Sequence, residues 1–286
     1  MITKAVLPVA GLGTRFLPVT KAVPKELLPL VDRPCIAYVI AEAVAAGIGD
    51  IVLVTSRGKS AIEDYFDSAP ALEASLEASG KKELLREVQA ATRLAKVISI
   101  RQHAPKGLGH AVLTAFPAIG MQDFAVILPD DIVDADPPAI GQLMAAQAET
   151  GGAVVALKEI QRERTDRYGI CAGPWVQNGR MRVDEMVEKP SPANAPSNFS
   201  IVGRYVLPGR IFSLLENTPV GRGGELQLTD AIAQLCAEGA VHGVRFTGVH
   251  HDTGNPLGLL EASIYYALKR PEFAEGTRAM LQGWTK

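Results

Sequence analysis

Residues 4–29 read KAVLPVAGLGTRFLPVTKAVPKELLP, and this stretch decides the fold. Its first part, residues 5–10, is a short apolar run with the length and composition of a buried strand. The run ends at Gly11 and Gly13, whose backbone freedom lets several N–H groups point toward one place. Three cations follow the glycines: Arg15, Lys21 and Lys25. A strand, a glycine loop and nearby cations together predict a site that holds a polyphosphate.

The glycine pair matches neither of two common nucleotide-binding loops. The dinucleotide fingerprint has a third glycine where this chain has Phe16, and its helix would run through Pro18 and Pro24. A P-loop closes with Gly-Lys-Ser or Gly-Lys-Thr, which this stretch lacks. Judged alone, the pair is more simply an ordinary turn with solvated lysines. Pro24 favours an extended Val23, so the segment that carries Lys25 is expected to be a bent arm rather than a helix.

Length and composition limit the possible classes of protein. A chain of 286 residues can form one large α/β domain or two small ones, with a substantial core. A formal charge of −2 gives no reason to expect a nucleic-acid partner. No apolar run is long enough to span a membrane, and no signal peptide precedes the first strand. The cysteines lack metal or disulfide spacing, so we expect a cytoplasmic protein with three buried thiols: Cys35, Cys171 and Cys236.

Apolar strands alternate with helices through the first half of the chain. The expected strands are 51–54, 97–100, 124–128 and 153–157, and the expected helices are 34–46, 59–66, 72–94 (broken near Gly80), 110–116 and 139–150. This alternation predicts a parallel sheet with helices on both faces. Strand-like runs then dominate at 168–170, 181–187, 201–207 and 241–246, with helices at 225–238 and 258–270. We therefore expect an α/β fold with a Rossmann-like, mixed but mostly parallel sheet in a single domain, 1–286.

A second glycine loop follows the expected strand 97–100. Ligands of open parallel sheets bind beyond the carboxyl ends of the strands, so this loop should share a rim with the first. Gln102 offers a donor and an acceptor, which suits the edge of a pyrimidine. Gly107 and Gly109 would let the backbone approach a flat ring. Judged alone, the loop is more simply a glycine-rich connection with a solvent-facing glutamine.

Acidic residues stand at two other expected strand ends. Asp130 and Asp131 follow strand 124–128, where carboxylates suit Mg²⁺ beside phosphates. A capping aspartate, or the acidic pair of a metal-dependent glycosyltransferase, would explain the doublet as well. Near Asp252, the paired His250 and His251 invite a transition-metal interpretation, but adjacent side chains on a strand cannot easily face one metal.

Glu188 and Lys189 end the apolar run 181–187. They are either a surface ion pair, worth little, or a pair that binds a sugar phosphate. In the second case the carboxylate accepts hydrogen bonds from sugar hydroxyls and the ammonium holds the phosphate.

Together these strings resemble the sugar-nucleotide pyrophosphorylase family, in order and spacing from the first strand to the last helix. Pro24-Lys25-Glu26 is similar to its uridylyl-transferring branch. The other matching strings are Gln102 with Lys106 to Ala111, Asp130, Tyr168-Gly169, Glu188-Lys189-Pro190, Ser197-Asn198 to Tyr205, Gly224 to Asp230, and Asp252 to Asn255. One departure is Pro256, which stands where many members have a lysine.

The resemblance implies transfer of the uridylyl group of UTP to glucose 1-phosphate, giving UDP-glucose and pyrophosphate, with Mg²⁺ as cofactor. By matching positions it assigns the nucleotide to Ala10, Gly11, Gly13, Thr14, Gln102 and Gly107, the sugar to Gly169 and Glu188, the metal to Asp130 and Asp252, and catalysis to Arg15, Lys25 and Lys189. We expect residues 1–150 to form the nucleotide-binding half, 151–255 the sugar-phosphate half and 256–286 a C-terminal helical region. We also expect the chain to form a homo-oligomer. Two rivals are a metal-dependent glycosyltransferase that uses UDP-glucose and a non-catalytic regulator that binds UTP or UDP-glucose.

Overall fold

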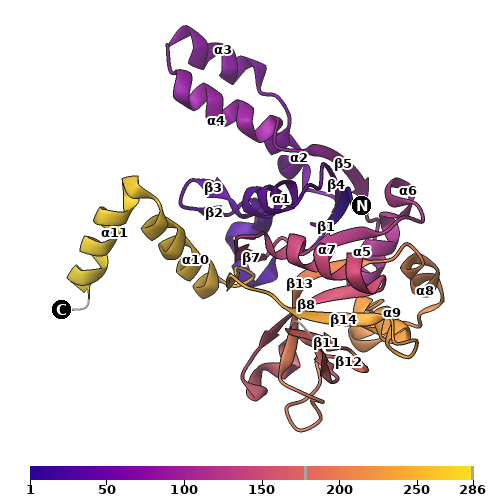
Figure 1. The fold of residues 1–286 in the computed structure, drawn as a ribbon. Helices are drawn as coiled ribbons and strands as arrows, with labels where there is room; N and C mark the ends of the chain where they lie inside the picture. Colours follow the sequence, from indigo (N-terminus) through magenta and orange to yellow (C-terminus); the bar gives the residue numbers. More distant parts are fainter. Residues whose placement is uncertain (177–178, 285–286) are drawn as a thin grey trace.

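The computed structural model describes residues 1–176 and 179–284, which fold around one large mixed sheet (Figure 1). Four neighbouring strands are parallel, in the order β5 (Lys96–Arg101), β4 (Asp50–Thr55), β1 (Lys4–Pro8) and β6 (Phe124–Ile127). Next to β6, β13 (Phe199–Leu207) runs antiparallel, and so continues the sheet into β8 (Ala153–Glu159) and β14 (Val241–Arg245). The remaining strands of this sheet are β11 (Arg180–Arg182), β10 (Trp175–Val176), β9 (Gly169–Ala172) and β12 (Glu185–Glu188).

Helices cover both faces of the sheet, which explains why its central strands β1, β4 and β6 are almost entirely apolar. In β1, Ala5 and Leu7 join one buried cluster, whereas Val6 joins the other. The first cluster includes residues of α1 (Cys35–Ala45), α2 (Ser60–Phe66), α7 (Ala139–Thr150) and α10 (Pro256–Lys269). The second includes residues of α5 (Leu108–Thr114), α6 (Phe116–Ile119), α8 (Ile211–Asn217) and α9 (Leu228–Cys236). The predicted α/β class is confirmed.

Two helical hairpins extend from the sheet: α3 (Pro70–Ala78) with α4 (Lys82–Thr92), and α10 with α11 (Pro271–Trp284) (Figure 1). None of the helices in the described parts of the chain is both long and apolar enough to cross a membrane. The three cysteines are buried as expected, and burial raises the pKa of Cys236 to about 11.

Among the predicted elements whose bounds differ in the structure, three have a clear physical reason. The expected strand 181–187 is divided, because its first part pairs with β14 as β11 and its second part pairs with β9 as β12. The helix expected from residue 225 begins only at Leu228, because Leu226 N–H donates to Lys106 O at 2.8 Å and is therefore held in a loop. The helix expected from residue 258 begins at Pro256, where Asn255 caps it by accepting from Gly258 N–H at 3.0 Å.

A two-stranded ribbon that the sequence pattern does not predict crosses the end of β6. It consists of β7 (Asp131–Asp134) and β15 (Val249–Asp252), paired antiparallel with Asp131 opposite Asp252. Thr253 reinforces the pairing, because its N–H and hydroxyl both donate to Asp130 O, at 2.7 and 2.9 Å. The ribbon thus brings the two predicted metal-binding segments side by side.

A buried ion pair fixes the position of β13. Arg204 is fully buried, and its Nε and Nη2 donate to the two carboxylate oxygens of Glu42 on α1, at 3.0 and 2.6 Å. Glu42 Oε1 also accepts from Ile140 N–H at the start of α7. Arg204 Nη1 donates to Leu128 O, just after β6. One guanidinium therefore joins two strands and two helices.

Replacement of Glu42 by Ala should destabilise the fold by about 3–5 kcal/mol, because the Arg204 charge stays buried without its partner. The matched control is Glu238→Ala, which breaks the exposed pair with Arg210 and should cost at most about 1 kcal/mol. Urea unfolding of both variants measures the difference. Similar losses for the two variants would show that the buried pair has no special role.

Candidate active site

The loop after β1 folds back on itself, so that Lys25 returns to the glycines. Residues 14–27 contain three short 3-10 helices, η1 (Thr14–Phe16), η2 (Val19–Lys21) and η3 (Lys25–Leu27). The segment bends as predicted, but Lys25 itself begins a short helical turn. Gly13 has a φ of 65°, and a Cβ there would lie 3.1 Å from Lys25 Cβ. Thr20 Oγ1 donates to Gly13 O at 2.8 Å. Gly13 therefore lets the Lys25 side chain pass close to the backbone.

Lys25, Asp130 and Asp252 meet at the ribbon. Lys25 Nζ lies 2.5 Å from Asp130 Oδ2. Burial alone would lower the pKa of Lys25, but the charge and hydrogen bond of Asp130 outweigh it, and the pKa is raised. A Cβ on Gly254 would lie 3.0 Å from Asp130 Oδ2 and 3.1 Å from Asp252 Oδ1, so the two carboxylates converge on one point. Arg15 reaches the same place, with Nη1 3.5 Å from Gly254 O.

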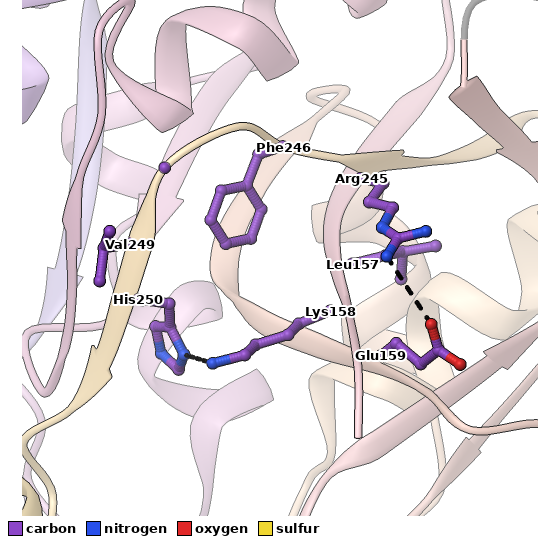
Figure 2. Close-up of a pocket in the computed structure, with 8 residues that line it drawn as sticks. Leu157, Lys158, Glu159, Arg245, Phe246, Val249 and His250 are labelled. Atoms are coloured by element: carbon purple, nitrogen blue, oxygen red, sulfur yellow. Dashed lines mark hydrogen bonds and ion pairs between the residues drawn. The ribbon is translucent and has the colours of Figure 1, made fainter. Parts of the chain in front are cut away.

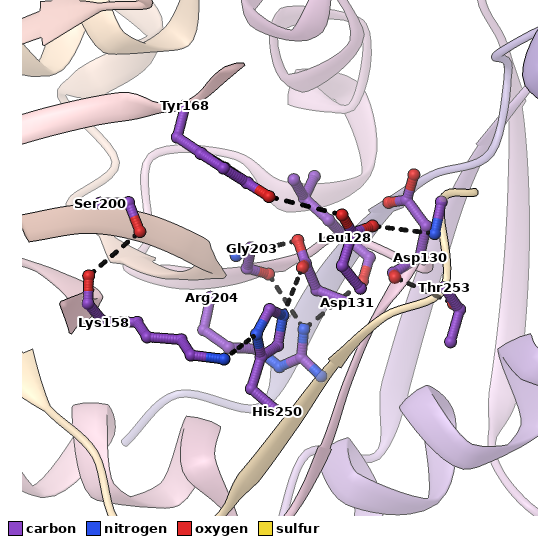
Figure 3. Close-up of polar contacts among 12 residues, drawn as sticks. Leu128, Asp130, Asp131, Lys158, Tyr168, Ser200, Gly203, Arg204, His250 and Thr253 are labelled. Carbon is purple, nitrogen blue, oxygen red and sulfur yellow. Dashed lines mark hydrogen bonds and ion pairs between the residues drawn. The ribbon is translucent and has the colours of Figure 1, made fainter. Parts of the chain in front are cut away.

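Asp131, next to this pair, has a different environment (Figure 3). Its Oδ1 lies 2.6 Å from His250 Nε2, and its Oδ2 accepts from Gly203 N–H at 3.2 Å. Burial opposes the Asp131 charge, but His250 and the nearby Arg204 outweigh it and lower the pKa of Asp131. Oδ1 thus joins the two strands of the ribbon, and Oδ2 holds the ribbon against β13.

The paired histidines lie in different surroundings, which disfavours a shared metal. His250 contacts Asp131 and lies 3.2 Å from Lys158 Nζ, as Figures 2 and 3 show. His251 packs instead against Tyr265, with ring centroids 4.5 Å apart. Within the described residues, no group of three or more His, Cys, Asp or Glu side chains is arranged to hold a metal ion.

Two pockets lie beside the ribbon. The pocket of about 370 Å³ is lined by residues of β8, β14 and β15 and contains none of the predicted site residues (Figure 2). The other, of about 460 Å³, is lined by Tyr168 and Asp252 among others. Only the larger pocket therefore adjoins the predicted site.

The second glycine loop lies beside the first, as predicted. Gln102 N–H donates to Thr55 O at 2.8 Å, and the next residue, Ser56, donates its hydroxyl to Ala10 O at 3.0 Å. Gln102 is buried and not solvent-facing, with Nε2 2.8 Å from His110 Nδ1 and 3.4 Å from Gly107 O.

The glycines in this loop also have a packing role that the sequence pattern does not predict. A Cβ on Gly107 would lie 2.7 Å from Glu225 Cβ, and a Cβ on Gly109 would lie 2.8 Å from Leu226 O. Gly109 N–H also donates to Leu226 O at 2.9 Å. Close packing against residues 225–226 therefore requires both glycines, whatever a ligand requires.

Glu188, Gly169 and Lys189 form the far end of the site. Glu188 Oε2 accepts from Thr229 Oγ1 at 2.6 Å, and Oε1 lies 2.7 Å from Lys189 Nζ. The Glu188 side chain is only 13% exposed, which argues against an ordinary surface pair. A Cβ on Gly169 would lie 3.3 Å from Glu188 Oε2, so a larger residue would crowd the carboxylate.

Lys189 adopts a backbone conformation that is rare for residues other than glycine. Its φ is 48°, and its N–H donates to Tyr168 O at 3.0 Å. Such strain, about 1–3 kcal/mol, persists where the surroundings impose it and is frequent at functional sites. Tyr168 in turn donates its hydroxyl to Asp252 Oδ2 at 3.4 Å. Tyr168 thus links the Glu188–Lys189 end to the carboxylates.

The predicted residues therefore lie along one rim with three parts. Gln102 and Gly107 form one end and connect to Ala10 through Thr55 and Ser56. The middle contains Gly11, Gly13, Arg15, Lys25, Asp130 and Asp252, and the other end, beyond Tyr168, contains Gly169, Glu188 and Lys189. Thr14 is exposed at the start of η1. Lys21 is exposed and forms no ion pair in the part of the chain that the structure describes. Tyr168, Thr229 and His110 make contacts within the rim that the sequence analysis did not assign to them.

Comparison with known proteins identifies close relatives along almost the whole chain. A UTP–glucose-1-phosphate uridylyltransferase of Staphylococcus epidermidis is 48% identical over 281 residues, which cover 98% of each chain. A second, from Staphylococcus saprophyticus, is 49% identical over 268 residues, 94% of this chain and 93% of the relative. The solved structure of a UTP-bound UGPase from Acinetobacter baumannii has a TM-score of 0.91 and 44% identity, with 99% of both chains covered.

A solved UDP-glucose pyrophosphorylase complexed with UDP-glucose has a TM-score of 0.85 and 39% identity, over 94% of this chain and all of the other. The resemblance inferred from the sequence motifs is confirmed. Nucleotidyltransferases of this kind generally use a divalent metal ion. The family model for nucleotidyl transferases matches residues 4–268, and the chain belongs to that family of enzymes.

Proposed function

We propose that the chain transfers the uridylyl group of UTP to α-D-glucose 1-phosphate, forming UDP-glucose and pyrophosphate in the cytoplasm. The observation that carries the proposal is the convergence of Asp130 and Asp252 on one point beside Lys25 and Arg15. Gln102, whose amide can recognise the edge of a pyrimidine, lies toward one end of this rim. The Glu188–Lys189 pair lies at the other end. The names of the close relatives support the same reaction.

The reaction needs alignment more than activation. The phosphate of glucose 1-phosphate is already an anionic nucleophile, so no general base is required. The chain must hold two polyanions together and keep attack at the α-phosphorus in line with the leaving pyrophosphate. Lys25 stays protonated because its pKa is raised, and with Arg15 it stabilises charge on the triphosphate. Lys189 positions the attacking phosphate, and Glu188 binds the sugar hydroxyls.

The carboxylates fit a magnesium ion. Asp130 and Asp252 present one oxygen each to a common point, and carboxylate oxygens are preferred ligands of Mg²⁺. When bound there, the ion would supply charge neutralisation for the phosphate oxygens. Asp131 is not among the atoms nearest to this point, and its carboxylate instead pairs with His250 and accepts from Gly203 N–H.

The two rival functions fit the structure less well. A glycosyltransferase that used the acidic doublet would need Asp131 to be accessible to a metal, and it would give no role to Lys189. A regulator that only binds UTP or UDP-glucose would have no need for the converging carboxylates and cations.

Two broader expectations belong to this proposal: a single-domain organisation and a homo-oligomer. The second is supported by large apolar side chains exposed on α10 and α11: Leu257, Leu260, Met280 and Trp284. Such side chains are typical of contact surfaces.

A pyrophosphate-release assay with UTP, glucose 1-phosphate and Mg²⁺ tests the function directly. The proposed enzyme releases pyrophosphate only when both substrates are present. A glycosyltransferase would consume UDP-glucose without releasing pyrophosphate, and a regulator would bind the nucleotide without turnover. Either result would reject the proposal.

Gly254→Ala should reduce turnover about 100-fold while the protein stays folded, because the new Cβ occupies the point on which Asp130 and Asp252 converge. Asp252→Asn should have a similar effect, because it removes one of the two charges. The control is Gly49→Ala, where a Cβ meets no atom within 4 Å. The measurements are kcat and binding of Mn²⁺ to each variant. Normal Mn²⁺ binding by Gly254→Ala would place the metal elsewhere.

The cations should differ in kinetic effect. Lys189→Ala should raise the KM for glucose 1-phosphate and leave UTP affinity nearly unchanged, whereas Arg15→Ala should lower kcat, since charge on the leaving pyrophosphate grows in the transition state. Loss of such a contact commonly costs about 10²–10³ in rate. The control is Arg182→Ala on β11, which breaks an exposed ion pair with Asp184. Calorimetric titration with UTP and kinetics with each substrate varied separate the two roles, and loss of UTP binding in Lys189→Ala would contradict them.

A further inference from the structure

The environment of Gln102 fixes which way its side-chain amide points. Nε2 lies 2.8 Å from His110 Nδ1 and 3.4 Å from Gly107 O. A carbonyl oxygen can only accept, so the Gly107 contact requires the amide nitrogen and not the amide oxygen on this side. His110 Nδ1 must then also accept, which means that His110 is neutral and carries its proton on Nε2.

Two further observations agree with this arrangement. Burial and the nearby charge of Lys106 lower the pKa of His110, which favours the neutral ring at physiological pH. The Gly107 carbonyl is also held firmly, because Lys106 O accepts from Leu226 N–H and Gly107 packs against Glu225. The acceptors that surround the Gln102 amide are therefore rigid.

The amide oxygen is left for a ligand. Both hydrogens of Gln102 Nε2 are directed to protein acceptors, and no described residue donates to Oε1. Oε1 is not among the buried oxygens without a partner, so solvent or a ligand can reach it. On this side Gln102 offers an acceptor and no donor.

We propose that His110 is a positioning residue which, with the Gly107 carbonyl, locks Gln102 as an acceptor for the N3–H group of a uracil ring. The inference rests on the proposed function, in which Gln102 contacts the base. Uracil has a hydrogen on N3, whereas cytosine presents a lone pair there and would meet Oε1 acceptor to acceptor. The lock therefore discriminates against CTP. It does not discriminate against TTP, because thymine has the same N3–H.

His110→Ala should free the amide to rotate, so that Nε2 can face the N3 lone pair of cytosine. The expected result is a fall of about tenfold in the ratio of kcat/KM for UTP to that for CTP, mainly through KM, with the UTP to TTP ratio unchanged. His110→Asn, which can keep an acceptor near the position of Nδ1, should restore most of the discrimination. His103→Ala, an exposed histidine of the same loop, is the matched control.

Two results would overturn the proposal. Equal losses for UTP, CTP and TTP in His110→Ala would indicate a purely structural role, and an unchanged UTP to CTP ratio would show that the amide is not locked by His110. Gln102→Ala is measured in parallel, and an unchanged ratio in that variant would mean that the base is read elsewhere. Calorimetric binding of UTP and CTP to the same variants needs no turnover. It therefore tests the lock even if the wild-type chain releases no pyrophosphate and the proposed reaction is wrong.

Discussion

The buried guanidinium of Arg204 is the constraint on which the rest of the structure depends. A charge without contact with water is tolerated only where its donors are satisfied, and an unpaired one costs several kcal/mol. Glu42 supplies a bidentate carboxylate, and the carbonyl of Leu128 accepts a further hydrogen bond. Since Leu128 lies two residues before Asp130, the requirement to pair Arg204 also fixes the turn that presents the carboxylate proposed to bind the metal.

The parallel half of the sheet could be predicted from sequence because its signals are local. The run 5–10 and the run 51–54 are apolar at every position, and α2 begins five residues after the end of β4. The antiparallel insertion of β13 could not be predicted in the same way, because an apolar strand has the same composition whichever direction its neighbours run. The sequence of the two-stranded ribbon gives even less indication that it forms strands. Asp131–Asp134 begins and ends with aspartate, and it is a strand only because β15 pairs with it.

The site likewise contains residues that local sequence patterns reveal and residues that only the tertiary fold reveals. The residues that the family motifs single out lie on one rim, yet three of their partners were not assigned any role. Thr229 donates to Glu188 from a helix 41 residues further along the chain, and Tyr168 reaches Asp252 across 84 residues. Such contacts depend on the tertiary fold and leave no local pattern. Gly107 and Gly109 were noticed as glycines, but their close packing against residues 225–226 could not be predicted, because those residues are distant in the sequence.

The ribbon has a consequence for protein synthesis. Thr253, which holds Asp130 in place, lies 123 residues after it in the chain. At about 5–20 residues per second, translation of that interval takes roughly 6–25 s. During this time the nascent chain contains the glycine loop, Lys25 and Asp130 but lacks the second carboxylate. In the proposed function both carboxylates are needed, so we expect catalytic competence only when nearly the whole polypeptide has been synthesised.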